Sequence, residues 1–162
     1  MADSVNYLDW YYKANQDLQA AKLFFKATDS ENGVDYAITA FHCQQCIEKY
    51  LKGHILKLTD ELSGTTHNLT VLCNKAGKLD ITFKNFIDDC AFVDEFYIEP
   101  RYPVDILFIN KRDGEDCLNI ATKIAEHVLE LDNVAMLTDE QKQKREIALA
   151  EHNAKLAEGR KK

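Results

Sequence analysis

The stretch FHCQQCIEKYLK, residues 41–52, decides the fold class of this chain. It lies inside a segment, about 34–58, whose apolar residues recur at intervals of three and four, as they do on a helix. These residues fall on two sides of a helical wheel. One side carries Ala40, Cys43, Ile47, Tyr50, Leu51, His54 and Leu58, and the other carries Ile38, Phe41 and Leu56. A helix that is apolar on two sides packs against neighbours on both, so we expect it at the centre of a helical protein.

Helical periodicity continues along the rest of the chain, over about 3–27, 68–77, 81–97, 113–131 and 138–162. Only two prolines and six glycines are available to break these segments, which favours long helices over a many-turned β fold. We therefore predict an all-α protein: an antiparallel up-and-down four-helix bundle with an extra short helix and a C-terminal helical arm. The bundle would comprise residues 1–137 and the charged arm residues 138–162.

The formal net charge of −7 is unevenly distributed along the chain. Residues 138–162 carry seven Lys or Arg and five Asp or Glu, whereas residues 1–137 carry thirteen and twenty-two. An acidic body argues against non-specific binding to a nucleic-acid backbone, which requires clustered positive charge. A local basic pocket remains compatible with this composition.

The sequence indicates a cytoplasmic protein with no membrane association. It contains no run of about 18 apolar residues, and its N-terminus lacks the basic start and apolar stretch of a secretory signal. The five cysteines are odd in number and scattered among apolar neighbours, as expected for reduced thiols that pack like small hydrophobic residues.

Neither a metal nor a cofactor is expected. Cys43 and Cys46 form a CxxC pair, but no second pair accompanies it and no βαβ pattern surrounds it. His42, Cys46 and His54 could be considered as ligands. On a helix, however, His54 points well away from the other two, so these three side chains do not form a metal site.

A line of polar side chains follows one flank of the central helix. Gln45, Glu48 and Lys52 lie at helical spacing beside the apolar core face. One interpretation is a half-exposed flank on which Glu48 and Lys52 form a surface ion pair worth about 0.3–0.5 kcal/mol. The other is that amide, carboxylate and ammonium groups converge on a groove. The sequence leaves both interpretations open.

Two connections between helices carry further polar groups. In THNL, residues 66–69, either Thr66 or Asn68 could cap the helix that follows, with His67 between them. The second connection, IEPRYPVDI at residues 98–106, contains both prolines of the chain and is therefore stiff and extended.

Arg101 in this second connection is one of two arginines within residues 1–137. A rigid connection that presents Arg101 together with Tyr97 and Tyr102 suits an anion or a nucleotide, because a guanidinium binds phosphate and an aromatic ring stacks on a base. The alternative is that Arg101 closes the bundle by hydrogen bonding to carbonyl groups at a helix C-terminus.

Four pieces of the sequence together resemble the HEPN domain family. They are DWYYKANQDLQAAKLFF (9–25), AFHCQQCIEKYLK (40–52), THNL (66–69) and YIEPRYP (97–103), in the family's order and approximate spacing. The resemblance covers about residues 5–131 and is specific only as a combination. It implies an all-α bundle, a homodimer, and a nucleotide- or RNA-related role, commonly as partner of a small nucleotidyltransferase in a toxin–antitoxin pair.

The sequence departs from the ribonuclease members of the family. Those members carry an arginine followed, after four to six residues, by a histidine, whereas Arg101 is followed by YPVDILF. The group expected to transfer protons in RNA cleavage is therefore missing at its usual place. Arg145 and His152 match the spacing, but they lie in the arm, outside the matched region, and we interpret this match as chance.

Three hypotheses follow. In the favoured one, a non-catalytic protein binds a nucleotide or nucleotidyl group: Arg101 holds phosphate, and Tyr97 or Tyr102 stacks or forms a hydrogen bond. The remaining residues that would line the site are Gln45, Glu48, Lys52 and His67. In the second, the chain is a metal-independent endoribonuclease toxin in which His67 or His42 replaces the missing histidine. In the third, it is a helical dimerisation and interaction module whose arm clasps a nucleotidyltransferase.

Overall fold

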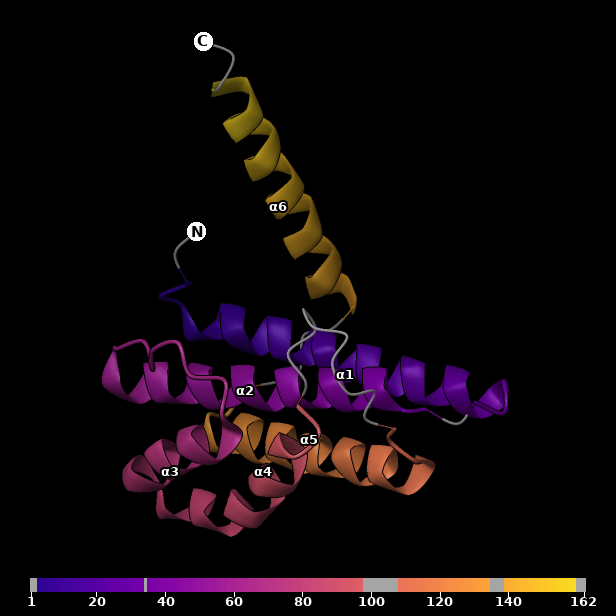
Figure 1. The fold of residues 1–162 in the computed structure, drawn as a ribbon. Coiled ribbons are helices and arrows are strands. Elements are labelled where there is room, and N and C mark those ends of the chain that lie inside the picture. Colours follow the sequence, from indigo (N-terminus) through magenta and orange to yellow (C-terminus); the bar gives the residue numbers. More distant parts are fainter. Residues whose placement is uncertain (1–2, 34, 98–107, 135–138, 160–162) are drawn as a thin grey trace. The chain divides into compact units, whose positions relative to one another are not determined.

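The computed structural model describes residues 3–33, 35–97, 108–134 and 139–159, and all regular secondary structure in these ranges is helical (Figure 1). The predicted all-α class is confirmed. Three long helices and a set of shorter ones form the body. The elements are α1 (Tyr7–Ser30), α2 (Ala37–Thr59), α3 (Leu69–Leu79), the 3-10 helix η1 (Ile81–Phe86), α4 (Ile87–Asp94) and α5 (Lys111–Leu131).

The central position of α2 agrees with its two apolar sides. It packs against α1, α5, α3 and α4, and Figure 1 shows it between α1 and the remaining helices of the body. Nearly all of its residues from position 43 to position 56 are buried, with Gln45 and Lys49 partly exposed. Its core side chains interlock with those of α1 and α5. The buried members on these two neighbours are Tyr11, Ala14, Leu18, Ala21, Cys117, Ile120, Ala121, Ile124, Ala125 and Val128.

The contact between α1 and α2 depends on a glycine. A Cβ atom at Gly53 would lie 2.7 Å from the Tyr11 ring and 2.9 Å from the Cβ of Trp10. Glycine therefore allows the backbone of α2 to approach the aromatic side chains of α1 more closely than any other residue would.

Asp132 closes one end of the body. This residue follows α5 and accepts a hydrogen bond from the hydroxyl group of Tyr11 on α1. Its carboxylate also contacts Nδ1 of His54 at 3.2 Å and Nζ of Lys57 at 3.0 Å, both on α2. One buried carboxylate thus joins the end of α5 to the start of α1 and the end of α2, so α5 runs antiparallel to α1 and parallel to α2 (Figure 1).

The segment 81–97 differs from the single helix that the sequence predicted. It consists of η1 followed by α4, and the α-helix ends at Asp94. The carboxylate of Asp94 accepts hydrogen bonds from the backbone N–H groups of Leu69 and Thr70, at 2.8 and 2.9 Å. These are among the N–H groups that the first turn of α3 cannot satisfy internally. The end of α4 is thereby tied to the start of α3.

Residues 133–162 form a separate compact unit. It contains α6 (Asp139–Gly159), in agreement with the predicted helix over 138–162, and all its residues from position 150 to position 159 are exposed. The predicted domain boundary, between 137 and 138, lies outside the described residues. None of the described helices combines the length and apolar character needed to cross a membrane.

Candidate functional site

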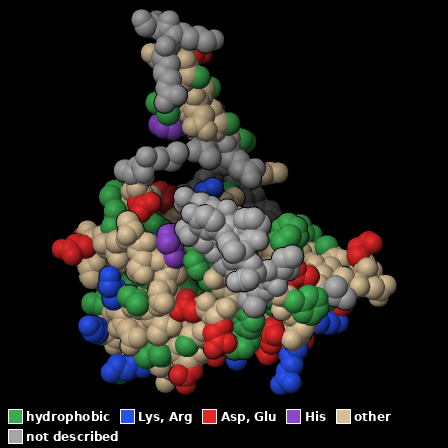
Figure 2. Space-filling model, in the orientation of Figure 1, with side chains coloured by type: hydrophobic (Ala, Val, Ile, Leu, Met, Phe, Trp, Pro, Cys, Tyr) green, Lys and Arg blue, Asp and Glu red, His purple; other side chains and the backbone are tan. Residues whose placement is uncertain are grey.

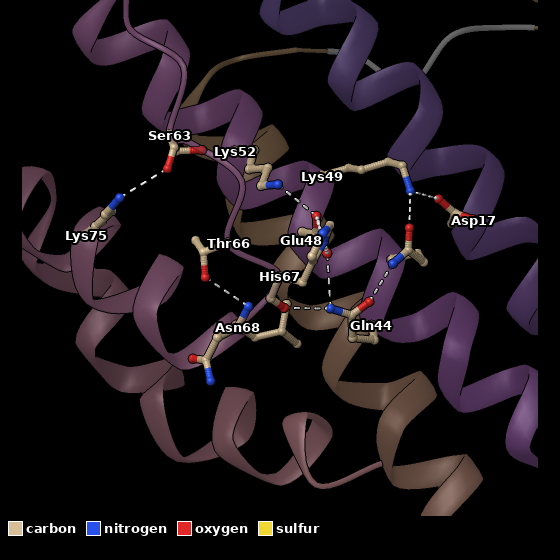
Figure 3. A network of polar contacts seen from close by, with 12 residues as sticks. Asp17, Gln44, Glu48, Lys49, Lys52, Ser63, Thr66, His67, Asn68 and Lys75 are labelled. Atoms are coloured by element: carbon tan, nitrogen blue, oxygen red, sulfur yellow. Dashed lines mark hydrogen bonds and ion pairs between the residues drawn. The ribbon is translucent and has the colours of Figure 1, made fainter. Parts of the chain in front are cut away.

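Glu48, on the inner flank of α2, is a buried carboxylate with three donors around it (Figure 3). It accepts hydrogen bonds from Nζ of Lys52 at 2.9 Å and from Nε2 of Gln44 at 3.1 Å. The third donor is Nδ1 of His67, which lies 3.0 Å from Oε1 of Glu48. A carboxylate with this many donors is well compensated for its loss of water.

The interpretation of Glu48 and Lys52 as an exposed surface pair is wrong. Their side chains are only 6% and 7% exposed, and the ion pair lies inside the protein. The helical spacing was consistent with either outcome, because an i,i+4 pair has the same local geometry at the surface and in the interior. Burial comes from the neighbouring elements, which cover this flank of α2.

His67 is the exposed residue among those that contact Glu48. Its side chain is 55% exposed, although its Nδ1 is held by the buried Glu48. Because an ionised carboxylate only accepts hydrogen bonds, Nδ1 carries the proton in this contact. In the neutral imidazole, Nε2 is then an acceptor, and it has no hydrogen-bond partner among the described residues.

Main-chain contacts hold His67 in this position. Nε2 of Gln44 donates to the carbonyl oxygen of His67 at 2.9 Å as well as to Glu48. The next residue, Asn68, caps α3: its side-chain oxygen accepts from the backbone N–H of Val71 at 2.8 Å. Of the two residues that the sequence offered as caps, Thr66 and Asn68, the structure shows Asn68 in this role. His67 is fixed between α2 on one side and the start of α3 on the other.

The polar contacts continue along α2 to α1 (Figure 3). Nε2 of Gln45 donates to Gln44 at 2.7 Å, and Nζ of Lys49 donates to Gln45 at 2.9 Å and to Asp17 at 2.7 Å. The other oxygen of Asp17 contacts Nδ1 of His42 at 2.9 Å. This second imidazole–carboxylate pair lies outside the candidate site, which we define as Gln44, Glu48, Lys52 and His67.

Two aromatic side chains border the candidate site. Nζ of Lys52 lies 5.9 Å from the centre of the Trp10 ring, a cation–π distance. The ring of Tyr97 stacks on His67, with 6.3 Å between ring centres and 23° between planes. The Trp10 ring therefore lies near the cation of the buried ion pair, and the Tyr97 ring lies against the partly exposed imidazole.

The structure brings together five of the seven residues that the sequence singled out. Glu48, Lys52 and His67 are in direct contact, and Gln45 joins them through Gln44. Tyr97 contacts His67 through its ring. The last two, Arg101 and Tyr102, lie outside the described residues.

Sequence reasoning missed three members of the network. Gln44 was not among the predicted site residues, yet it is the residue that bonds both Glu48 and the His67 backbone. Asp17 and Lys49 were not singled out. The spacing of Gln45 and Lys49 is a helical one, but nothing in the sequence indicates that Asp17, 32 residues from Lys49, lies opposite on α1.

The thiols of the CxxC pair, Cys43 and Cys46, are buried and unreactive. Burial raises the pKa of the Cys43 and Cys46 thiols well above the usual range, so neither forms the reactive thiolate at neutral pH. Within the described part of the chain, no group of three or more His, Cys, Asp or Glu side chains is placed to hold a metal ion.

A hollow of about 420 Å³ lies elsewhere, at the end of α1 and the start of α5. Its charged side chains, Asp29 and Lys111, already pair with each other at 2.5 Å. Figure 2 shows Lys and Arg side chains scattered among acidic ones over the described part of one face, without a single basic patch. Neither the hollow nor the distribution of surface charge indicates a better candidate site than Gln44, Glu48, Lys52 and His67.

The HEPN domain family model matches residues 7–131, which include α1 to α5 and every residue of the candidate site. This chain belongs to the HEPN domain family. Its fold is also that of two solved proteins. A crystal structure of ST0689, an archaeal HEPN homologue, is 25% identical, with a TM-score of 0.58 over 78% of this chain and 97% of that one. The crystal structure of TT1696 from Thermus thermophilus is 24% identical, with a TM-score of 0.62 over 76% and 96%, and supports the fold alone.

The chain also has a relative among the curated proteins. The Methanocaldococcus jannaschii protein called "Putative toxin MJ1304" is 27% identical over 132 residues, which are 74% of this chain and 80% of the relative. The alignment therefore includes most of both chains.

Proposed function

We propose that this chain is a HEPN-type protein that binds a nucleotide or nucleotidyl group at the Glu48–His67 site, as the homodimeric member of a two-component system with a nucleotidyltransferase. Arg101 and Tyr102, from the connection that follows Tyr97, would complete the site by holding phosphate and base. The chain itself would need neither metal nor cofactor for this role.

One observation carries the proposal: the buried Glu48–Lys52 pair holds His67, a neighbour whose side chain is largely exposed. Burying an ion pair seldom improves stability over an apolar pair of the same size, because both charges must lose their water. A buried pair that also orients an exposed imidazole, itself stacked on the Tyr97 ring, is better explained as part of a binding site than as a device for stability.

Thermal unfolding of the purified protein in the presence of ATP, GTP, their diphosphates and a short RNA tests this proposal. A ligand at a hundred times its dissociation constant stabilises the folded state by about 2.7 kcal/mol. For a domain of this size the midpoint would rise by roughly 5–10 °C. No shift with any of these compounds would contradict nucleotide binding.

Arg101→Ala should abolish the shift if this guanidinium holds phosphate. Arg112→Ala is the matched control, because Arg112 is the other arginine of residues 1–137 and is exposed at the start of α5. Equal shifts in both variants would remove Arg101 from the site. Light scattering with and without a co-expressed nucleotidyltransferase would test the homodimer and the partnership by mass.

The second candidate function is an endoribonuclease toxin of the same family. The relative named as a toxin favours it. The difficulty is the absence of a histidine four to six residues after Arg101, so that another group must transfer the proton.

A further inference from the structure

A second hollow, of about 260 Å³, lies between the end of α2 and the outer flank of α3. We propose that this α2–α3 groove is a docking surface for a partner protein, and that it receives a helix with apolar and acidic side chains. Its walls include Ile55 and Leu62 on one side and Lys75, Lys78 and Leu79 on the other. None of these residues belongs to the candidate site, so the inference does not depend on the proposed function.

The walls of the α2–α3 groove are held in place by contacts within the protein. The hydroxyl group of Thr59, the last residue of α2, donates to the carbonyl oxygen of Ile55 at 2.8 Å. Nζ of Lys75 donates to the carbonyl oxygen of Ser63 at 3.1 Å, which ties the connection after α2 to α3 (Figure 3). The groove is therefore formed before a partner arrives, and docking loses little conformational freedom on this side.

The size of the hollow favours side chains of a protein over a complete small molecule. Ligand pockets commonly enclose about 300–1,000 Å³ and bury most of the ligand. At about 260 Å³, this hollow is smaller than that range. Leu62 and Leu79 on its walls are 44% and 46% exposed, so a large part of each side chain is in contact with water. Apolar side chains of a partner would remove this surface from water, which is favourable in proportion to the area covered.

The charge of the groove decides which kind of partner fits. Lys75 and Lys78 are both exposed and lie three residues apart on one flank of α3. Among the described residues neither lysine forms an ion pair, and the lining contains a single acidic residue, Glu61. Residues 1–137 as a whole carry thirteen basic and twenty-two acidic residues. An acidic partner is therefore repelled by most of the body and attracted at this groove.

A comparison with the larger hollow supports this assignment. There, Lys111 is already neutralised by Asp29, with 2.5 Å between the two charged groups. In the α2–α3 groove, Lys75 bonds only to a carbonyl oxygen, and Lys78 has no hydrogen bond or ion pair with the other described residues. The two lysines of the groove are thus available to carboxylates of a partner.

A helix is the form of partner segment that suits this groove. The last turn of α2 and the outer flank of α3 are both helical walls, and a further helix packs its ridges of side chains into such a groove. Acidic residues three or four positions apart on that helix would face Lys75 and Lys78. Its apolar stripe would lie against Leu62 and Leu79, as in other complexes in which an amphipathic helix occupies a groove.

The test uses the full chain and two fluorescein-labelled peptides of about 15 residues, the length at which an isolated helix becomes marginally stable. Both have leucine at helical spacing; one has glutamate beside the leucines and the other lysine. We expect the glutamate peptide to bind in fluorescence anisotropy and the lysine peptide not to bind. Lys75→Glu combined with Lys78→Glu should weaken binding roughly tenfold or more. Lys26→Glu, exposed on α1, a helix that does not line the groove, should bind like wild type.

Two further measurements test the apolar part of the groove. Leu79→Ser should weaken binding of the glutamate peptide, and so should serine in place of the leucines of the peptide. All the substituted residues of the protein are exposed, so the variants should remain folded, which thermal melts would verify. No binding of the glutamate peptide, equal binding of both peptides, or unchanged affinity in the double lysine variant overturns the proposal. Equal binding of the peptide without leucine shows attraction by charge alone and overturns it as well.

Discussion

Lys52 and Glu48 lie one turn apart on α2 and neutralise each other inside the protein, with 2.9 Å between Nζ and Oε1. This relationship determines much of the candidate site, because Glu48 also holds His67. It has consequences for stability that can be measured independently of any ligand.

Lys52→Met should destabilise the protein by about 3 kcal/mol, because it leaves the carboxylate of Glu48 buried without its cation. Urea unfolding followed by circular dichroism would measure the change. Glu48→Gln combined with Lys52→Met should recover most of the loss, because no unpaired charge then remains. Lys111→Met is the control: its partner Asp29 is exposed, and we expect little change. Similar effects at the two lysines would show that the Glu48–Lys52 pair is not desolvated.

Gly53→Ala should cost about 1–3 kcal/mol, the usual range for overpacking. The added Cβ would lie 2.7 Å from the Tyr11 ring, so α1 and α2 would have to separate. Gly159→Ala, at the end of α6, adds the same methyl group with nothing within 4 Å and should be neutral or slightly stabilising. Thermal melts of both variants would suffice, and an unaffected midpoint in Gly53→Ala would contradict the close approach.

The carboxylate of Asp132 should make stability depend on pH in the acid range. Burial raises its pKa, but hydrogen bonds from His54, Tyr11 and Lys57 outweigh burial, and the net pKa lies below the usual value. A lowered pKa in the folded state means that the contribution is present above the ordinary aspartate pKa and is lost as pH falls through the folded-state pKa. We expect the unfolding free energy to decrease below about pH 4. Asp132→Asn should be less stable at pH 7 and show a shallower acid dependence; the same slope in both proteins would exclude Asp132 as its source.

Ionisation of the Tyr11 phenol should reduce the stability of the protein at alkaline pH. Burial, and next the hydrogen bond to Asp132, raise the pKa of its phenol above the ordinary value. The neutral phenol is therefore favoured in the folded state, and its contribution is fully present below about pH 10 and lost above it. Tyr11→Phe should unfold with a weaker dependence on pH between about 10 and 11. An unchanged dependence would point to another group.

All five cysteines should be unreactive until the protein unfolds. Each is a free, buried thiol that the reagent cannot reach in the folded protein. Burial also raises the pKa of Cys117 to about 12, whereas a hydrogen bond with Cys90 lowers the pKa of Cys73, whose protection depends on burial alone. Reaction with an aromatic disulfide reagent at pH 8 should therefore be slow in buffer and reach five equivalents in guanidinium chloride. A fast equivalent under native conditions would identify a cysteine that opens to solvent.

The positions of most helices could be predicted from the pattern of neighbouring residues in the sequence. Periodic apolar residues identified α1, α2, α3 and α5 to within a few residues, because a helix needs only one continuous apolar stripe and suitable ends, and both are properties of neighbouring positions. The expected helix over 81–97 was divided into η1 and α4 and ended at Asp94. Its end is tied by hydrogen bonds to α3, 24 residues away, which periodicity cannot reveal.

The sequence alone predicted the all-α class and the resemblance to the family, and it singled out Gln45, Glu48, Lys52 and His67 as candidates without deciding whether they face a groove or solvent. Only the tertiary structure decided that Glu48 and Lys52 are buried, that Gln44 joins them to His67, and that Asp132 meets Tyr11 and His54. Helix formation depends on backbone hydrogen bonds four residues apart. Burial and charge pairing depend on which surfaces of different helices meet, and that is settled by packing over the whole body.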